Sequence, residues 1–419
     1  MSASDEIKLP GSRTVAVIGG GPAGLMAAEL LARAGAIVTV YDQMASLGRK
    51  FLLAGRGGLN LTHSEDLKLF LTRYGDVDPL LRAAIEAFPP GALRAWSDSL
   101  GQPTFVGSSG RVFPTALKTS PLLRTWLMRL NNRGVTFKLR HRWEGWDREG
   151  NLRFVAGGNE VAVESEATVL ALGGASWPKL GSDGGWTKIL QAQDIAVAPL
   201  KPANCGFTAV WSEVFRGFEG KPLKGIAISF AGQSVRGEAM VTRDGLEGGA
   251  VYALSSPIRD AIERDGEAVV DVDLMPETSA AKLSARLAKP RGKQSLSNFL
   301  RKATHLSPAA LALVREAALS TGVALPALNA EELAGLIKTA PVRLIATQPI
   351  KTAISTAGGL SFSELDDGFM LKRHPGIFIA GEMLDWDAPT GGYLLQASFA
   401  TGAAAAYGAI AWLRDRAHA

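Results

Sequence analysis

Apolar and polar positions near the start of the chain predict a strand, a helix and a second strand in close succession. Residues 13–18 form a short run rich in β-branched residues, which is typical of a buried parallel strand. A helix with one apolar face follows and ends near Gly35, and residues 36–41 form the next apolar run. The apolar face consists of Leu25, Ala28, Leu31 and Ala32. This order predicts a βαβ unit in an open parallel sheet.

The pattern changes twice further along the chain. Residues 64–134 are predicted to be mostly helical, and short strands follow up to residue 172. A stretch of alternating apolar and polar residues then precedes an Ala/Leu-rich helical stretch, after which Gly-rich sequence returns. We therefore expect an α/β fold in which residues 1–195 and 346–419 form one discontinuous domain. The insertion between them, residues 196–345, is expected to have a β part over 196–276 and a helical part over 277–345.

Residues 19–24 (Gly-Gly-Gly-Pro-Ala-Gly) match G-x-G-x-x-G between the first strand and its helix. In such a turn Gly19 permits the tight bend, Gly21 lets the backbone approach a pyrophosphate, and Gly24 lets helix and strand pack closely. The helix N-terminus offers N–H groups to the phosphates. Asp42 ends the second strand, where a carboxylate accepts hydrogen bonds from ribose hydroxyls. These features predict a dinucleotide site, and the alternative is an ordinary βαβ turn.

A second loop rich in Gly and Arg, residues 46–62, follows the strand that carries the acid. A nicotinamide-binding domain has no need of such a loop, whereas an extended flavin needs its diphosphate, ribityl chain and ring to be lined. Arg49, Lys50 and Arg56 are candidates to neutralise phosphates or an anionic substrate. The loop therefore indicates FAD as the cofactor, and the alternative is a solvated basic loop.

Two more apolar strands end in glycines. One ends at Gly173-Gly174, and residues 376–381 form the other, which is followed by Glu382. A carboxylate in the latter position suits a ribityl hydroxyl, and the next helix directs its N-terminus at the electron-rich edge of a flavin. The alternative is a plain βα unit with a surface acid.

The catalytic residues are not identified by the sequence. Tyr393, Asp385 and Asp387 lie in the loop expected beside the ring, so each is a weak candidate to donate or accept a proton. Hydrogen bonds that cap the loop are the more ordinary role for both Asp residues. The five His residues show no paired metal spacing, so we expect no metal site.

Composition narrows the functional classes. The single Cys205 excludes an internal disulfide framework and a flavin–disulfide relay. The excess of 45 basic over 40 acidic residues is small and no Lys/Arg run reaches five, so we expect no nucleic-acid partner. Neither an apolar signal core nor a membrane span is evident, which suggests a cytoplasmic protein. Either a monomer or a homodimer fits these data.

Taken together, the motifs resemble those of bacterial NAD(P)/FAD-dependent oxidoreductases of the aminoacetone-oxidase-like type. The motifs that carry this resemblance lie at 19–24, 48–50, 55–60, 110–114, 172–178 and 381–393, and it spans essentially the whole chain. It implies a glutathione-reductase-type FAD domain interrupted by a β-barrel-like and helical insert. One position departs from the family pattern, because Leu59 stands where the family's Gly-rich loop usually has Cys.

The resemblance and the motifs together define the residues expected to bind the cofactor. They are Gly19, Gly21, Pro22, Ala23, Gly24, Asp42, Gln43, Arg49, Lys50, Asn60, Gly173, Gly174, Gly381, Glu382, Gly391, Gly392 and Tyr393. The expected reaction is hydride transfer between flavin N5 and a small organic substrate. Turnover as an oxidase and turnover with NAD(P)H as donor both remain open. The alternative is a flavin-containing RNA-modifying protein or a non-redox flavin-binding protein.

Overall fold

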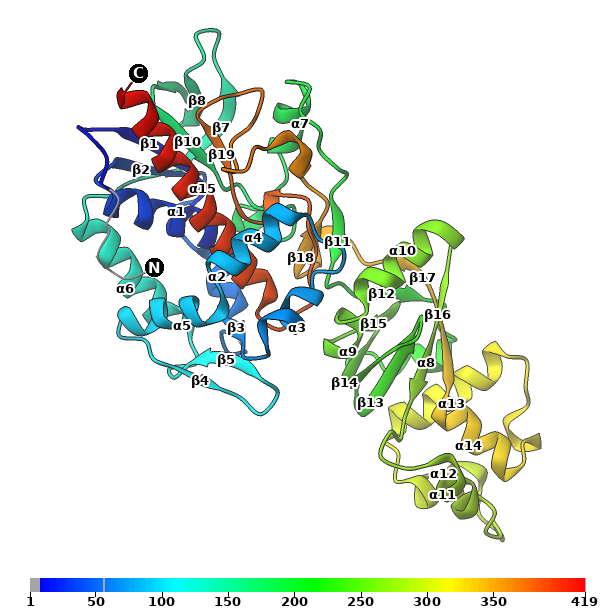
Figure 1. The fold of residues 1–419 in the computed structure, drawn as a ribbon. Helices are drawn as coiled ribbons and strands as arrows, with labels where there is room; N and C mark the ends of the chain where they lie inside the picture. Colours follow the sequence, from blue (N-terminus) through cyan, green and yellow to red (C-terminus); the bar gives the residue numbers. More distant parts are fainter. Residues whose placement is uncertain (1–7, 56, 419) are drawn as a thin grey trace. The chain divides into compact units, whose positions relative to one another are not determined.

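The computed structural model describes residues 8–55 and 57–418, which divide into two compact units (Figure 1). Unit 1 contains the chain up to Lys201 and again from Ser355, and unit 2 is Pro202–Ile354. Unit 2 therefore begins six residues after the expected insertion start at 196 and ends nine residues after 345. Each unit has its own hydrophobic core.

Unit 1 is built around a five-stranded parallel sheet in the order β19-β10-β1-β2-β6. The predicted βαβ unit is confirmed, because helix α1 connects β1 to its parallel neighbour β2. Since all strands run in one direction, the Gly motifs that follow β1 and β10 lie at the same edge of the sheet. The bounds are β1 Thr14–Ile18, α1 Pro22–Arg33, β2 Ile37–Asp42, β6 Thr136–Leu139, β10 Ala167–Leu170 and β19 Ile377–Ile379.

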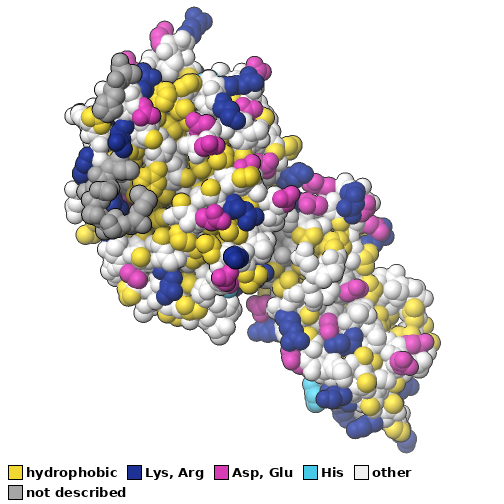
Figure 2. Space-filling view, viewed as in Figure 1, with side chains coloured by type: hydrophobic (Ala, Val, Ile, Leu, Met, Phe, Trp, Pro, Cys, Tyr) yellow, Lys and Arg dark blue, Asp and Glu magenta, His cyan; other side chains and the backbone are white. Residues whose placement is uncertain are grey.

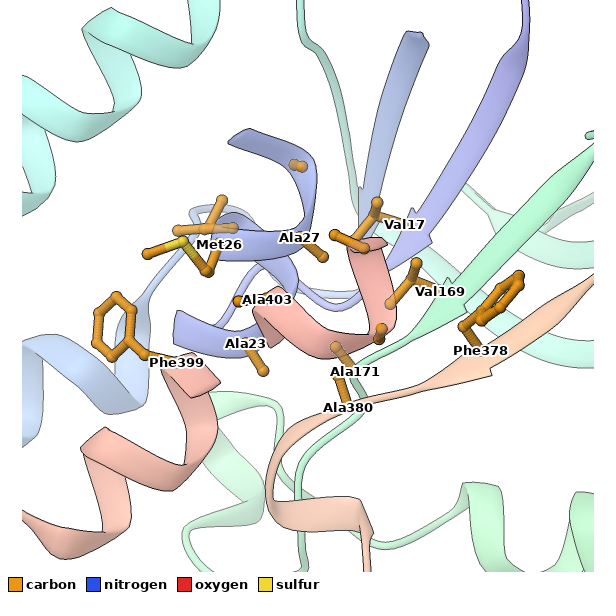
Figure 3. Packing of buried hydrophobic residues seen from close by; sticks show 14 of the residues in the cluster. Val17, Ala23, Met26, Ala27, Val169, Ala171, Phe378, Ala380, Phe399 and Ala403 are labelled. Carbon is orange, nitrogen blue, oxygen red and sulfur yellow. The ribbon is translucent and has the colours of Figure 1, made fainter. Parts of the chain in front are cut away.

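Helix α15 (Tyr393–His418) packs against α1 in the core of unit 1. Small residues make this approach close: a Cβ on Gly402 would lie 2.3 Å from the carbonyl oxygen of Ala23. Figure 3 shows Ala23, Met26 and Ala27 of α1 beside Phe399 and Ala403 of α15, near the sheet residues Val17, Val169 and Phe378. By length and composition α15 alone among the described helices can cross a membrane, and 61% of its apolar window is buried in the protein. Its apolar composition matches this core position.

Two small antiparallel sheets and a set of helices complete unit 1. The sheet β3-β5-β4 was not predicted, because its strands have only two to four residues. The bounds are β3 Thr62–His63, β4 Thr104–Val106, β5 Arg111–Pro114, β7 His141–Trp146, β8 Leu152–Ala156, β9 Asn159–Val163 and β18 Ser355–Ala357. The helices are α2 Arg49–Ala54, α3 Leu67–Thr72, α4 Pro79–Ala87, α5 Pro90–Ser99, α6 Thr119–Asn132 and α7 Trp186–Gln191.

Unit 2 contains a closed barrel in the order β12-β15-β14-β13-β16-β17. We expected the helical part to extend to residue 345, and this is wrong. Strand β17 occupies Ala340–Thr347 and pairs with both β16 and β12, which closes the barrel. Its residues Ala340, Val342 and Leu344 alternate inward and are buried. The other barrel bounds are β12 Phe207–Ala209, β13 Pro222–Phe230, β14 Gln233–Thr242, β15 Gly245–Glu247 and β16 Ala268–Asp273, and β11 (Lys201–Ala203) lies outside the barrel.

Four helices lie in the chain between the adjacent barrel strands β16 and β17. Ser or Asn side chains cap the N-termini of all four, which explains where each helix begins. Their apolar faces join the barrel residues in one core. The helices are α11 Ala280–Leu287, α12 Leu296–Thr304, α13 Pro308–Ser320 and α14 Ala330–Lys338, and the shorter helices near the barrel are α8 Glu213–Arg216, α9 Gly249–Tyr252 and α10 Ser255–Asp265.

Candidate cofactor and active site

The turn between β1 and α1 uses its three motif glycines in three different ways. Gly19 has φ +109°, and a Cβ there would lie 2.2 Å from the carbonyl oxygen of Ala171. A Cβ on Gly24 would lie 1.9 Å from the carbonyl oxygen of Gly19, so this glycine permits helix and turn to touch. At Gly21 a Cβ would meet nothing within 4 Å. Gly19 and Gly24 are thus required by the fold, whereas Gly21 keeps a space clear.

The space beside Gly21 belongs to a cavity of about 120 Å³ at the N-terminus of α1. A second cavity of about 500 Å³ adjoins it, and Gly19, Asp42, Leu172 and Gly181 line both. Among the described residues, no side chain caps this helix N-terminus. Its first N–H groups and its positive dipole end therefore remain available to an anion.

Asp42 lies where the two cavities meet. Its Oδ2 accepts a hydrogen bond from the Gly20 N–H at 2.8 Å, and its Oδ1 accepts one from the Met44 N–H at 2.7 Å. Burial raises the pKa of Asp42 above its usual range, although these hydrogen bonds and Arg49 act in the opposite direction. The two backbone donors hold the carboxylate in place and leave it lone pairs for ribose hydroxyls.

Two buried polar atoms at the first cavity have no hydrogen-bond partner among the described residues. They are Nε of Arg49 and Oγ of Ser182. Buried polar atoms normally have partners, so these two indicate a polar ligand in the cavity. Arg49 begins α2, and the adjacent Gly48 N–H donates to the Gly20 carbonyl at 2.9 Å, which joins the two Gly-rich loops. The third predicted cation, Arg56, lies outside the described residues.

Lys50 and Glu382 form an ion pair at the same cavity, with Nζ 2.7 Å from Oε2. Lys50 also donates to Ser176 Oγ at 2.5 Å, and Glu382 accepts from the Thr356 N–H at 3.0 Å and the Gly174 N–H at 3.4 Å. We expected Lys50 to meet phosphates and Glu382 to meet a ribityl hydroxyl. In the structure they form an ion pair with each other. This pair connects α2 to the loop after β10, to strand β18 and to the turn after β19.

The cavities, the uncapped helix and the orphaned donors fit a dinucleotide. A family model described as the HI0933-like protein Rossmann domain matches residues 13–408. The chain belongs to the HI0933-like family. This is a family of flavin-dependent oxidoreductases with a Rossmann-like domain, so the expected resemblance and fold class are confirmed.

Curated proteins similar to this HI0933-like chain differ in the substrates that their names give. A 3-dehydro-bile acid delta(4,6)-reductase of Clostridium scindens is 25% identical over 93% of this chain and 97% of its own length. A ribosomal RNA dihydrouridine synthase of Escherichia coli is 26% identical over 94% of this chain and 97% of its own. A solved 3-ketosteroid delta1-dehydrogenase of Sterolibacterium denitrificans matches 96% of this chain and all of its own, with a TM-score of 0.53 and 12% identity, which shows the shared fold.

Tyr393, one of the residues expected beside the ring in this HI0933-like chain, belongs to a hydrogen-bonded cluster within unit 1. Its Oη donates to Glu65 Oε1 at 2.6 Å, and Arg73 donates to both carboxylate oxygens, at 3.1 and 2.8 Å. The ring of His63 stacks on Tyr393, with centroids 5.6 Å apart, and Tyr74 Oη donates to the Tyr393 carbonyl at 2.8 Å. Burial and the adjacent Glu65 raise the pKa of Tyr393. The phenol therefore keeps its proton, which it shares with Glu65.

This cluster predicts an acid-sensitive contribution to stability. Burial alone would raise the pKa of Glu65, but hydrogen bonds from Arg73 and Tyr393 outweigh burial and lower it below the ordinary value of 4.5. The contribution is therefore full above about pH 4.5 and is lost as pH falls through the lower folded value. In acid unfolding followed by circular dichroism, wild type should lose stability more steeply below pH 4.5 than Glu65→Gln. Parallel curves for the two proteins would contradict this assignment.

The other two candidate proton donors have different surroundings. Asp385 is exposed, and its main-chain N–H donates to the Leu360 carbonyl at 2.9 Å. Asp387 Oδ1 accepts a hydrogen bond from the Ala388 N–H at 2.8 Å, which is the loop-capping role considered above. Neither residue lines the two cavities.

The expected cofactor residues divide into two groups. Those that line the cavities are Gly19, Gly21, Pro22, Ala23, Asp42, Gln43, Arg49, Lys50, Gly173, Gly381 and Glu382, whereas Gly24, Asn60, Gly174, Gly391, Gly392 and Tyr393 do not. Gly392 instead packs on β3, because a Cβ added at this position would lie 2.5 Å from Thr62 Cα. Asn60 Nδ2 donates to the Thr62 carbonyl at 2.8 Å. The lining residues Gly20, Met44, Ser46, Gly181 and Ser182 were not among the expected cofactor residues, although Gly20 lies in the first Gly motif and Ser46 in the Gly/Arg-rich loop 46–62.

Proposed function

We propose that this protein is an FAD-dependent reductase that saturates a carbon–carbon double bond conjugated to a carbonyl group. The observation that carries the cofactor part of the proposal is the cavity at the N-terminus of α1, where open space at Gly21 meets the unpartnered Arg49 Nε and Ser182 Oγ. A pyrophosphate satisfies both donors and the helix N-terminus together. Asp42 is placed to hold the ribose at the junction with the second cavity.

FAD, when bound and reduced, supplies a hydride to the substrate. The chain contributes binding and orientation: the Gly19–Gly24 turn and Arg49 would hold the diphosphate, and the Lys50–Glu382 pair fixes the segments that would line the sugar-like chain. The names of the two curated relatives described above denote saturation of a double bond conjugated to a carbonyl, which favours a reductase over an oxidase. NAD(P)H is the proposed two-electron donor, and the substrate takes up the hydride together with a proton.

Anaerobic stopped-flow spectroscopy tests this proposal. FAD-reconstituted protein should lose its flavin absorbance with NADPH or NADH and regain it when a 3-keto-4-ene steroid or a uridine-containing RNA is added. Protein that stays colourless after reconstitution would contradict the cofactor assignment. Bleaching by amines rather than NAD(P)H, followed by reoxidation with O₂, would instead establish an oxidase and contradict the reductase.

A further inference from the structure

The positive charge of the chain is concentrated in one segment of unit 2. Residues 278–315 contain eight Lys and Arg and no Asp or Glu. The chain has 45 basic and 40 acidic residues. Outside this segment 37 basic residues remain beside all 40 acidic ones, so the net positive charge of the chain comes entirely from the segment. The basic residues are Lys282, Arg286, Lys289, Arg291, Lys293, Arg301, Lys302 and Arg315. The net charge of the chain is only +5, but its positive charge is concentrated in residues 278–315.

The fold displays these cations on the surface. All eight are exposed, and they lie on α11, α12, α13 and the loop between α11 and α12. Figure 2 shows Lys and Arg side chains over the helical end of unit 2. Within the described part of the chain, none of the eight forms an ion pair with a carboxylate. Unneutralised cations at this density create a field that attracts a polyanion.

The acidic residues next to the segment have other partners. Asp273 pairs with Lys338 at 2.5 Å, and Glu277 pairs with Arg236 at 2.5 Å. Glu316 is buried and accepts hydrogen bonds from the N–H and hydroxyl of Ser212 at 2.7 and 2.6 Å. At the N-terminus of α14, which packs on α11, Glu332 closes a capping box. Asp273 and Glu277 are thus paired with cations that lie outside the segment.

A groove of about 700 Å³ adjoins the segment in unit 2. It is lined by residues 304–310, at the junction of α12 and α13, by residues 274–278, which include Glu277, and by residues 221–226, which include Lys221 and Lys224. Such a groove suits unpaired bases, which folded RNA exposes and duplex DNA does not. No large hydrophobic side chain within residues 278–315, all of them described, is exposed, so the segment lacks the apolar anchors of a membrane-binding surface.

We propose that residues 278–315 and the adjoining groove form a docking surface for folded RNA. The sequence totals led us to expect no nucleic-acid partner, and the segregation of charge revises that expectation. The surface lies outside the cofactor cavities of unit 1. If the reductase proposed above is correct, the surface favours an unsaturated base in RNA as its substrate.

The test is equilibrium binding of the full-length, FAD-reconstituted protein to a hairpin RNA with an unpaired, uracil-containing loop. The variant Lys289→Glu/Arg291→Glu/Lys293→Glu changes only exposed residues of the α11–α12 loop. It should bind at least about 10-fold more weakly at 100 mM salt, and the slope of log K against log salt should fall by about 2–3. The matched control, Arg82→Glu/Arg124→Glu/Arg148→Glu, changes three exposed cations of unit 1 by the same charge and should keep wild-type affinity.

Several outcomes would overturn the docking surface. These are equal affinities of wild type and patch variant, an equal loss in the control, duplex DNA binding as tightly as the hairpin, and binding to phosphatidylglycerol vesicles in place of RNA. Flavin absorbance and its bleaching by NADPH are recorded on the same samples. A normal flavin signal without RNA binding therefore contradicts the surface alone, and RNA binding without flavin contradicts the proposed reductase alone.

Discussion

Gly21→Val is expected to reduce FAD affinity by at least about 100-fold while leaving unit 1 folded. The backbone at Gly21 has φ −86° and ψ −177°, which valine adopts readily, and the new side chain meets no protein atom within 4 Å of its Cβ. It instead occupies the cavity at the N-terminus of α1, where the backbone must come close to the pyrophosphate. FAD titration by fluorescence quenching, with circular dichroism of the FAD-free protein, measures both quantities.

Two further glycine variants separate binding from folding. Gly91→Val introduces the same side chain at an exposed helical position with open space, so it should bind FAD like wild type. In Gly24→Ala the new methyl would lie 1.9 Å from the carbonyl oxygen of Gly19, so that variant should lose stability as well as cofactor. Normal FAD affinity of Gly21→Val would disprove the assignment of the cavity.

Glu29→Ala should destabilise unit 1 by about 3–5 kcal/mol, which is the usual cost of removing one member of a buried charged pair. Glu29 lies on α1 with only 4% of its surface exposed. Its Oε2 accepts hydrogen bonds from Trp126 Nε1 at 2.7 Å and Trp96 Nε1 at 3.0 Å, and its Oε1 accepts one from Arg129 at 3.0 Å. Alanine leaves two buried indole donors and a guanidinium without this acceptor. Urea unfolding followed by tryptophan fluorescence measures the change.

Two controls accompany Glu29→Ala. Glu29→Gln keeps one acceptor oxygen, so it should cost less than alanine. Glu160→Ala removes a carboxylate that is 71% exposed and 3.4 Å from Arg153, where an ion pair contributes about 0–1 kcal/mol. If Glu29→Ala were no more destabilising than Glu160→Ala, the cluster would not be a structural anchor of α1.

The parts of the fold that were predictable from the sequence are those whose signals are local. The β1–α1–β2 unit was predictable because an apolar strand, a Gly turn and a one-sided helix follow one another within about thirty residues. Strand β17 was not, because Pro341 and Arg343 interrupt its apolar run after a long helical stretch. Only pairing with β16 and β12, which are distant in sequence, makes it a strand. The two- to four-residue strands of β3-β5-β4 carry too little pattern to recognise.

The same limit applies to the candidate site. Asp42 and Arg49 were predictable because they follow the motif closely in sequence. Ser182 reaches the cavity from the Gly-rich loop that follows Gly173-Gly174, but no periodicity marks its side chain as a ligand. Tyr393 was expected beside the ring because of its neighbouring glycines, but its hydroxyl partner Glu65 lies 328 residues away and was not foreseeable. Likewise, total charge gave no indication that the positive residues are segregated, because acidic residues elsewhere cancel them.

The helical part of unit 2 leaves and rejoins the barrel at neighbouring points, because Val272 of β16 pairs with Ala340 of β17. An insertion whose two ends lie on paired strands can change in length and sequence. Such a change does not shift the register between β16 and β17. The segment that carries the positive charge can therefore change without altering the fold of unit 1. Under the docking surface and the reductase proposed above, a change in this segment would alter the binding partner and leave the redox chemistry of unit 1 in place.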